Sequence, residues 1–527
     1  MNLDANQLSL AGRKAVSARQ WATVSACARK LLQLNGDSAE GFFLAGLASK
    51  AARNGDAAVA SLERALKADA GRYDAAIELA NLYCAARRNG EAYSLVRSYE
   101  NRLSNSPVYS HMAGLVYSGI GLPELAWPHF ERANRLQPGV DVFQASLATC
   151  AVFLGRSDEA IALYRALIER HPTHQRNHYQ LSRLLQAENR EHIDAMLDVL
   201  KRTDQSPDKN VFMYYAIGKE FEDLGEWEQA FTFFRKAGDA VASVARYRLE
   251  SDLSLIETFM RVCNGDWLAT DNASSDEGYL DRRPVFVVGL PRTGTTLVER
   301  TIASHSMVQS LGETQFTQMV VRRESGIASE EKITPAMVEA AAQVPIERIG
   351  EGYRQMIDYR LGDEPVFVDK LPFNIFYLGF IAKAFPNAGI VVVNRDPMDA
   401  CFAMYKQVFT WAYKFSYTLD GLAKFYPVYR QLLAHWREQL GTRLIEVDYE
   451  DLVADHDGET RRLLAALDLP FEDACLRFNE NRTASTTASA VQVREKVHSR
   501  SVGRWRRYER QLEPLRAGLA NAGIDIS

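Results

Sequence analysis

A small residue recurs at a fixed interval through the first half of the chain, and this repeat restricts the possible folds more than any other feature. Six such residues follow one another at a constant step of 34: Gly12, Gly46, Ala80, Gly114, Ala148 and Ser182. After a slip of two residues, Gly218 continues the series. Two antiparallel helices cross closely where small side chains face each other, and large side chains one turn away fill the remaining gap. The interval therefore predicts a stack of helix pairs.

Each unit of this repeat carries further markers. A second small residue lies twelve positions after most of the first set, and a large residue often follows four positions later, as at Ala58 and Leu62, Ala126 and Phe130, Ala160 and Tyr164, and Ala230 and Phe234. Pro138 and Pro172 close two units, because proline ends a helix. The pattern resembles the tetratricopeptide repeat, whose period is 34 residues. We expect about six or seven repeats across residues 4–240 and a capping helix near 241–266, with an unrelated alanine-rich bundle as the alternative.

A solenoid of this kind does no chemistry by itself. Its concave face usually holds a peptide or a protein. The resemblance thus implies a protein or peptide partner bound by the repeats, while a rigid spacer and a platform for a homodimer remain alternatives.

The composition excludes several classes of protein. Hydrophobic residues make up 47% of the chain and charged residues 24%, as in ordinary globular proteins. A net charge of −5 argues against a general nucleic-acid binder. The six cysteines form no close pair, which excludes a CxxC zinc or redox motif. Because no apolar run reaches about 18 residues, we expect a cytoplasmic chain without a membrane span.

A polar, turn-rich stretch separates the repeats from a different pattern. Residues 269–283 read ATDNASSDEGYLDRR and precede a strongly apolar segment. The sequence therefore predicts a repeat solenoid with its capping helix over residues 1–268, a linker over 269–283 and a second domain over 284–527. A chain that begins near Glu277 is then expected to keep the binding functions of the second domain.

The segment PVFVVGLPRTGTTLVERTIASH, residues 284–305, carries the strongest functional signal. Residues 285–288 predict a buried parallel strand, residues 289–294 a tight loop, and Thr295 the start of a helix, where backbone N–H groups bind anions. The spacing is nearly that of a Walker A loop, but Thr295 takes the place of the lysine that bridges nucleotide phosphates. Arg292 and two threonines suit a single phosphate without a metal ion, and a degenerate kinase loop is the alternative.

The letters PRTGTT resemble the 5′-phosphosulfate loop of sulfotransferases, which bind 3′-phosphoadenosine 5′-phosphosulfate (PAPS) and release adenosine 3′,5′-bisphosphate (PAP). The resemblance implies that PAPS is bound by the loop residues Arg292, Thr293, Gly294, Thr295 and Thr296. A second apolar strand, residues 390–393, is followed by Arg395, which resembles the 3′-phosphate arginine of the same family. Where the family has a serine eight residues later, this chain has Ala403, so one hydroxyl contact to the 3′-phosphate is missing.

A cationic segment near the C-terminus extends the resemblance. In protein-tyrosine sulfotransferases a glutamine–valine pair closes over the nucleotide, with a tryptophan 13 residues after the glutamine, and Gln492, Val493 and Trp505 keep that interval. We assign Arg494 and Arg504 to the 3′-phosphate side, because a guanidinium gives a phosphate two parallel hydrogen bonds. For Trp505, support of the loop is the alternative.

Further residues fit the same family, and the resemblance covers residues 284–510. Tyr449 follows the strand LIEVD and matches a tyrosine at the nucleotide, with a core position as the alternative. Ser489 is placed to reach the sulfate, and Ser485 is the second candidate. Aromatic residues occupy every second position from Phe409 to Tyr417, which suits packing or the lining of an acceptor pocket.

Sulfuryl transfer needs a base beside the acceptor hydroxyl and a cation beside the leaving oxygen. The segment Leu-Gly-Glu-Thr resembles the catalytic segment of tyrosylprotein sulfotransferases and makes Glu313 the implied base, with His305 as the competing base. Lys370 ends the strand VFVDK and matches a lysine that polarises the bridging oxygen, a surface lysine being the alternative. Arg292 is expected to stabilise the transferring group.

The sequence thus predicts an N-terminal α-solenoid joined to an α/β domain. Helices on both faces would cover a mainly parallel sheet, with strands near 285–289, 366–369, 390–394 and 443–448. The implied activity is PAPS-dependent sulfuryl transfer without a metal, to a protein tyrosine, a glycan or a small molecule. An ATP-dependent P-loop kinase and a scaffold that has lost activity are the alternatives.

Overall fold

The structure is a computed structural model, and it describes residues 4–204, 206–245, 247–270, 282–409, 412–487 and 491–526. The chain forms two compact units, Met1–Cys150 and Ala151–Ser527. None of the helices in the described ranges combines the length and the apolar character that a membrane crossing requires.

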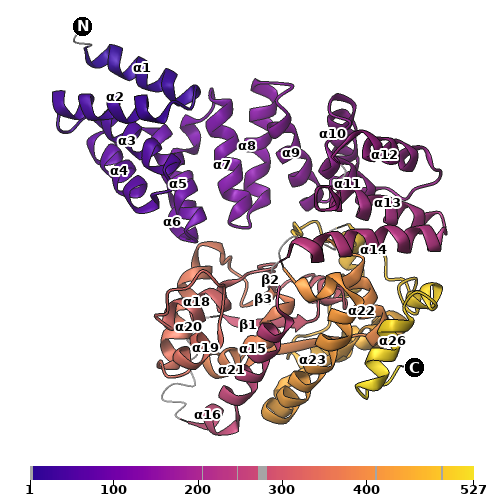
Figure 1. The fold of residues 1–527 in the computed structure, drawn as a ribbon. Helices are drawn as coiled ribbons and strands as arrows, with labels where there is room; N and C mark the ends of the chain where they lie inside the picture. The colour runs from indigo at the N-terminus through magenta and orange to yellow at the C-terminus, as the bar shows by residue number, and fades with distance from the viewer. Residues whose placement is uncertain are drawn as a thin grey trace. The chain divides into compact units, whose positions relative to one another are not determined.

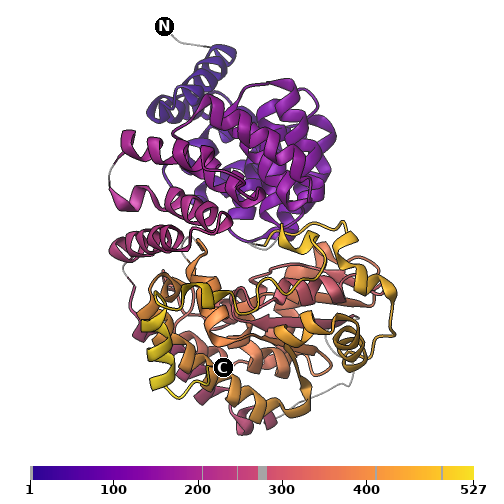
Figure 2. The same cartoon turned by 90° about the vertical axis from the view of Figure 1, so that its right-hand side faces the viewer.

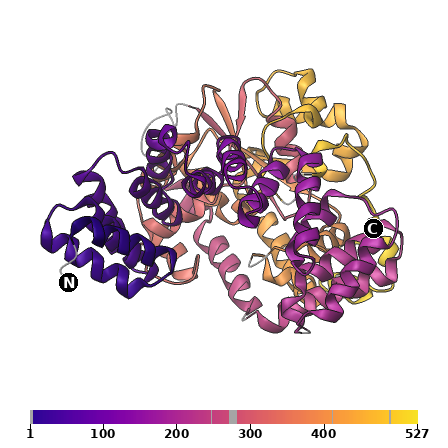
Figure 3. The ribbon, with the colours of Figure 1, turned by 90° about the horizontal axis from the view of Figure 1, so that it is seen from above.

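Helix pairs build the first unit, as the repeat predicts (Figure 1, Figure 3). They are α1 (Ala5–Ser17), α2 (Trp21–Leu34), α3 (Ala39–Ala51), α4 (Gly55–Ala68), α5 (Tyr73–Ala85), α6 (Asn89–Tyr99), α7 (Pro107–Gly119), α8 (Pro123–Leu136) and the start of α9 (Asp141–Phe153). The small markers lie where paired helices cross. A Cβ added at Gly46 would lie 2.7 Å from Leu62, and one at Gly114 would lie 2.7 Å from Phe130. These crossings leave no room for a side chain, so the glycines are required there.

The repeat pattern continues in the second unit. Its helices are α10 (Ser157–Arg170), α11 (Gln175–Leu184), α12 (Glu191–Arg202), α13 (Val211–Asp223) and α14 (Trp227–Val244), followed by α15 (Leu249–Val262) and α16 (Gly265–Ala269). A Cβ at Gly218 would lie 2.8 Å from Phe234, which repeats the contacts of the first unit. The expected capping helix is α15, and it packs against α19 and α23 of the α/β fold. The division predicted at residue 268 stays a prediction, and the last repeats share one compact unit with the α/β fold.

The sheet has five strands in the order β2-β3-β1-β4-β5, and every pair is parallel. They are β1 (Arg283–Gly289), β2 (Val308–Ser310), β3 (Val366–Lys370), β4 (Gly389–Asn394) and β5 (Leu444–Asp448). Four of them are the strands that the sequence predicts. Strand β2 was not predicted, because three residues are too few to show a pattern. In parallel strands the carboxyl ends meet at one edge, so the residues that follow β1, β3, β4 and β5 lie together.

Helices cover both faces of this sheet (Figure 2). Strand residues alternate between two apolar clusters, with Phe286 and Val392 in one and Val287 and Val391 in the other. The helices are α17 (Thr295–Ile302), α18 (Phe316–Glu324), α19 (Pro335–Ala341), α20 (Ile346–Ile357), α21 (Leu378–Ala384), α22 (Pro397–Tyr405), α23 (Leu419–Leu440), α24 (Tyr449–Ala454), α25 (His456–Ala466) and α26 (Glu513–Asn521). The predicted fold class, a helical repeat region with an α/β domain, is confirmed.

Candidate active site

The loop between β1 and α17 needs glycine at two positions. Gly289 and Gly294 have φ values of +148° and +104°, which side chains rarely allow. A Cβ at Gly289 would lie 2.7 Å from the carbonyl oxygen of Val393, and one at Gly294 would lie 2.5 Å from the ring of Tyr449. The loop is therefore packed tightly against β4 and the start of α24.

The start of α17 offers backbone and hydroxyl groups that could bind an anion. Gly294 precedes the helix and supplies no side-chain cap, so the first backbone N–H groups of the helix have no intrahelical partner. Thr293 Oγ1 donates to a carbonyl oxygen of the same loop at 2.8 Å and holds the loop closed. Thr295 and Thr296 are buried, and the Thr296 hydroxyl lies 3.5 Å from that of Thr487. This set of donors suits one phosphate group.

Two arginines meet beside this loop. Arg395 donates from Nη1 to the carbonyl oxygen of Arg292 at 2.8 Å and from Nη2 to that of Ser501 at 2.6 Å. Its guanidinium lies 4.7 Å from the ring centroid of Tyr449. Arg292 in turn donates from Nη2 to Gln492 Oε1 at 2.7 Å. The structure thus brings together four residues that the sequence assigns to the nucleotide.

The electrostatics of the loop favour an anion. Burial of Arg292, with the positive charges of Arg395 and Arg183 nearby, lowers the pKa of Arg292 to about 10. Arg183 lies on α11, a helix of the repeat region. Arg292 also has a φ of +68°, a strained conformation of the kind that clusters at ligand sites. A bound phosphate or sulfate would offset the repulsion among these cations.

Glu313 and Lys370 form an ion pair at the end of β3. The backbone N–H of Lys370 donates to the carbonyl oxygen of Gly312 at 3.0 Å, which fixes the predicted catalytic segment on the strand end. Lys370 Nζ donates to Glu313 Oε1 at 2.5 Å and lies 3.6 Å from Glu299 Oε2. The lysine side chain is fully buried, whereas that of Glu313 is 35% exposed. The accessible carboxylate can accept a proton, and the buried ammonium can donate one.

Asp369 is a buried carboxyl beside this pair that the sequence analysis did not single out. Its Oδ2 accepts hydrogen bonds from the hydroxyl groups of Thr314 and Tyr353, the latter at 2.7 Å. Burial raises the pKa of Asp369 to about 6. Because Thr314 directly follows Glu313, Asp369 holds the catalytic segment in place. Its position just before Lys370, at the end of a buried strand, is the sequence feature from which Asp369 could have been identified.

The competing base is engaged elsewhere. His305 is buried just beyond α17, its Nε2 lies 2.9 Å from the carbonyl oxygen of Pro470, and it is 3.6 Å from Glu472. Ser485 is also buried, and its backbone N–H donates to the carbonyl oxygen of Phe153 at 2.8 Å. Ser489, assigned to the sulfate, lies outside the described residues. The geometry therefore favours Glu313 over His305.

The C-terminal strap, defined here as residues 501–508, crosses the start of α22. Asp399 accepts from the backbone N–H of Gly503 at 2.6 Å and from that of Trp505 at 3.1 Å. The Trp505 side chain is buried, and its contact with the nucleotide stays a prediction. Val493, which precedes the strap in the chain, is buried in the short helix Gln492–Arg494.

Two of the predicted phosphate arginines have other partners. Arg494 donates to the carbonyl oxygens of Asn481 and Thr483 at 2.6 and 3.0 Å. Arg504 Nη2 lies 3.0 Å from Glu222 Oε2 on α13. The assignment of Arg494 and Arg504 to the 3′-phosphate stays a prediction.

The aromatic rings of Phe373, Phe409 and Tyr413 pack together. The ring centroid of Tyr413 lies 4.3 Å from that of Phe373 and 4.7 Å from that of Phe409. Burial, together with the charge of Glu313, raises the pKa of Tyr413. Residues 414–417 form a short 3-10 helix, so the alternating aromatic residues do not continue as one extended face. Both ring pairs are close to perpendicular, at 79° and 87°, and the effect of the Glu313 charge on Tyr413 indicates that this ring lies near the Lys370–Glu313 pair.

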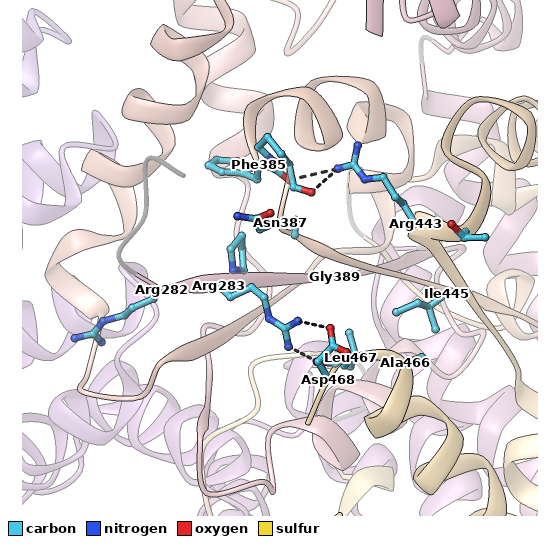
Figure 4. Close-up of a pocket in the computed structure, with 14 residues that line it drawn as sticks. Arg282, Arg283, Phe385, Asn387, Gly389, Arg443, Ile445, Ala466, Leu467 and Asp468 are labelled. Carbon is cyan, nitrogen blue, oxygen red and sulfur yellow. Dashed lines mark hydrogen bonds and ion pairs between the residues drawn. The ribbon is translucent and has the colours of Figure 1, made fainter. Parts of the chain in front are cut away.

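A separate cavity of about 600 Å³ lies at the opposite edge of the sheet (Figure 4). Residues at the amino ends of β1, β4 and β5 line it. Two of its arginines have protein partners: Arg283 lies 3.5 Å from Asp468, and Arg443 donates to the carbonyl oxygens of Ala382 and Pro386 at 2.9 and 3.1 Å. The chemistry-bearing residues lie at the carboxyl edge, so this cavity is not part of the candidate active site.

Comparison with known proteins agrees with this geometry. The model of the sulfotransferase family matches residues 284–473. An uncharacterised protein of Aquifex aeolicus is 28% identical over 308 residues, which cover 57% of this chain and 40% of that protein. Protein-tyrosine sulfotransferase 1 of Danio rerio is 25% identical over 247 residues, covering 42% of this chain and 65% of that enzyme. The chain thus spans less than two thirds of the length of either relative.

Among solved structures, the sulfotransferase domain from the Synechococcus PCC 7002 olefin synthase is similar, with a TM-score of 0.32 and 18% identity over 45% of this chain and 91% of that one. The C-terminal part of the chain thus carries a sulfotransferase family domain, over residues 284–473. The chain carries tetratricopeptide-like helical repeats before that domain and is distantly similar to tyrosylprotein sulfotransferases.

Proposed function

We propose that the protein uses PAPS as the donor and transfers its sulfuryl group to an acceptor hydroxyl by in-line displacement. One observation carries the proposal. The anion-binding loop, Arg395 and the Lys370–Glu313 pair follow three neighbouring parallel strands at one edge of the sheet. Ligands of open α/β sheets bind at that carboxyl edge.

The residues present fit the two phosphate ends of the nucleotide. On the 5′ side, the glycine loop and the start of α17 offer backbone N–H donors beside Arg292. On the 3′ side, Arg395 Nε is buried without a hydrogen-bond partner among the described residues, so it has a donor to offer. Ala403 supplies no hydroxyl, and the 3′-phosphate therefore depends on charge from arginine. That the reaction needs no metal stays a prediction.

Glu313 and Lys370 would divide the acid–base work. The donor supplies the sulfuryl group. The acceptor oxygen forms a bond to sulfur, the bond between sulfur and the bridging phosphate oxygen breaks, and PAP leaves. Glu313 accepts the acceptor proton, and Lys370 donates to the bridging oxygen as negative charge develops there. Lys370 Nζ is hydrogen-bonded to Glu313, so the lysine must turn away from Glu313 to reach the bridging oxygen. This turn frees the carboxylate to accept the proton.

The acceptor class follows from the surroundings of the base. The charge of Glu313 acts on Tyr413, whose ring packs against Phe373 and Phe409, and this supports an acceptor with an aromatic or apolar part next to its hydroxyl. A protein tyrosine has this chemistry, and the repeats support a peptide or protein acceptor because such solenoids hold extended chains. Binding of that partner, homodimer formation and a cytoplasmic location stay predictions.

A transfer assay with radiolabelled PAPS and a cell lysate tests the proposal. The wild-type protein should label an acceptor, and Glu313→Gln should lower the rate by about 10²–10⁴-fold, the usual loss for a general base, with PAP affinity retained. Glu324→Gln is the matched control, because this carboxylate is paired with Arg348 on the neighbouring helix at 2.7 Å. Turnover near the wild-type rate in Glu313→Gln would remove Glu313 as the base. A wild-type protein that binds PAP but labels nothing would favour an inactive scaffold.

A further inference from the structure

A carboxylate of the repeat region is built into the polar core of the α/β fold. Glu222 lies near the end of α13, and its side chain is 8% exposed. It accepts two hydrogen bonds from Lys406 Nζ, at 2.7 and 3.0 Å, and one from the hydroxyl of Tyr508 at 2.8 Å. Arg504 Nη2 lies 3.0 Å away. Burial would raise the pKa of Glu222, but the charges of Lys406 and Arg504 hold it below its ordinary value, so the carboxylate is ionised.

These partners belong to two elements that border the nucleotide site. Lys406 ends α22, the helix that begins just after Arg395. Arg504 and Tyr508 lie in the C-terminal strap. Glu222 therefore ties the strap to one end of α22, while Asp399 ties it to the other end. A buried ionic contact of this kind fixes its partners in one geometry, since a lone buried charge is costly.

The strap reaches the phosphate site through one hydrogen bond. The carbonyl oxygen of Ser501 accepts from Arg395 Nη2 at 2.6 Å. The other Nη atom of Arg395 is held by the carbonyl oxygen of Arg292. A strap that shifted would release one of these two contacts, and the guanidinium would lose its fixed direction.

We propose that Glu222 is a positioning residue for nucleotide binding: it fixes the C-terminal strap, whose Ser501 carbonyl orients Arg395 toward the 3′-phosphate. The proposal rests on the proposed function, because it requires that Arg395 binds this phosphate. It makes a repeat helix part of the nucleotide site. Loss of a group that orients a ligand-binding residue typically costs about tenfold or more in affinity.

The test is calorimetric titration of the full chain with PAP and with adenosine 5′-phosphate, which lacks the 3′-phosphate. Glu222→Gln should weaken PAP about tenfold and adenosine 5′-phosphate much less, because only PAP uses Arg395 in this way. General loosening of the fold would weaken both nucleotides alike. The ratio of the two affinities therefore separates positioning from a merely structural role.

Two further variants complete the experiment. Asp223→Asn is the matched control: Asp223 is the next residue on α13 and pairs with Lys219 at 2.6 Å, so the variant should leave the affinity ratio unchanged. Tyr508→Phe removes one strap contact to Glu222 and keeps the ring packing, and it should shift the ratio in the same direction by less. An unchanged ratio in folded Glu222→Gln overturns the proposal, and if that variant does not fold, an unchanged ratio in Tyr508→Phe does so. If the wild-type protein does not bind PAP, the proposed function itself fails.

Discussion

The helix pairs of residues 1–150 form a compact unit of their own, whereas those of residues 151–244 share a unit with the α/β fold. The local packing is the same in both. Gly114 faces Phe130 and Gly218 faces Phe234, where an added Cβ would lie 2.7 and 2.8 Å away. The later helices differ in their long-range contacts: Tyr215 OH donates to the carbonyl oxygen of Tyr405 at 3.3 Å. A repeat motif thus specifies how two helices pair, and other residues decide which compact unit they join.

Shortening the chain should have the largest effect on PAP binding, and the effect should depend on whether the helices of residues 151–244 are kept. A chain that starts at Gly139 keeps all the repeat helices of the second unit and should bind PAP like the full chain. A chain that starts at Arg282 loses Glu222 and leaves Lys406 and Arg504 without their carboxylate. We expect it to lose PAP binding, contrary to the separable domain that the polar linker suggests. Light scattering and PAP titration measure both, and equal affinity in the two shortened chains would contradict the account.

Removal of Arg395 should produce the next largest effect. A phosphate that loses one charge-assisted partner is weakened by about 2–5 kcal/mol. Arg395→Ala should therefore weaken PAP far more than adenosine 5′-phosphate, as titration of both nucleotides would show. Lys50→Ala, in the ion pair with Glu78 of the first unit, is the control and should alter neither affinity. The same loss for both nucleotides would separate Arg395 from the 3′-phosphate.

Two buried aspartates, Asp74 in the first unit and Asp369 in the second, should make the stability depend on pH in opposite ways. Burial alone would raise the pKa of Asp74, but Arg72 and Arg13 hold it below its ordinary value. Burial raises the pKa of Asp369, whose partners are hydroxyl groups, from 3.8 to about 6. Asp74 therefore stabilises the fold at pH values above its unfolded-state pKa. This stability is lost as the pH falls through the lowered pKa of the folded state. Asp369 contributes stability at low pH that is lost as the pH rises from about 4 to 6.

Thermal unfolding across this pH range measures the difference. Asp369→Asn should remove the loss of stability between pH 4 and 6, which corresponds to ~3 kcal/mol for a shift of about two pKa units. Asp74→Asn should instead flatten the loss at lower pH. If Asp369→Asn keeps the wild-type pH profile, the carboxyl is not a buried group with a raised pKa.

A matched pair of repeat substitutions gives the smallest expected effect. Gly114→Val and Gly218→Val overpack the same crossing in the two units, and each should cost about 1–3 kcal/mol of stability. Only Gly218→Val should also weaken PAP, because α13 carries both Gly218 and Glu222. Unfolding curves and PAP titration on both variants provide the measurement. Equal PAP affinity in the two variants would mean that α13 is not coupled to the nucleotide site.

The parts of the fold that the sequence predicts are those specified by neighbouring residues. The period of 34 marks the helix pairs, and long apolar runs mark four strands. The glycine loop, Arg395 and Lys370 stand next to the ends of predicted strands, so their meeting at one edge followed from parallel pairing. Strand β2 was missed because three residues carry no periodic signal.

The remainder depends on contacts that no local pattern encodes. Glu222 and Tyr508 are 286 residues apart in sequence and meet in the buried cluster. The pairing of Arg504 with Glu222 could not be predicted from the basic segment in which the arginine stands. The hydrogen bonds from Arg494 to the carbonyl oxygens of Asn481 and Thr483 could not be predicted either. Charge type was readable from the sequence, but side-chain direction was not.

Calorimetry with PAP and with ATP–Mg²⁺ distinguishes a PAPS-binding site from the site of a P-loop kinase, because the loop has Thr295 where a kinase loop has lysine. We expect the full chain to bind one PAP without added metal and to bind ATP–Mg²⁺ far more weakly. Arg395→Ala should abolish the preference for PAP over ATP–Mg²⁺. Binding of ATP–Mg²⁺ as tight as that of PAP, or no binding of PAP, would contradict the proposed function.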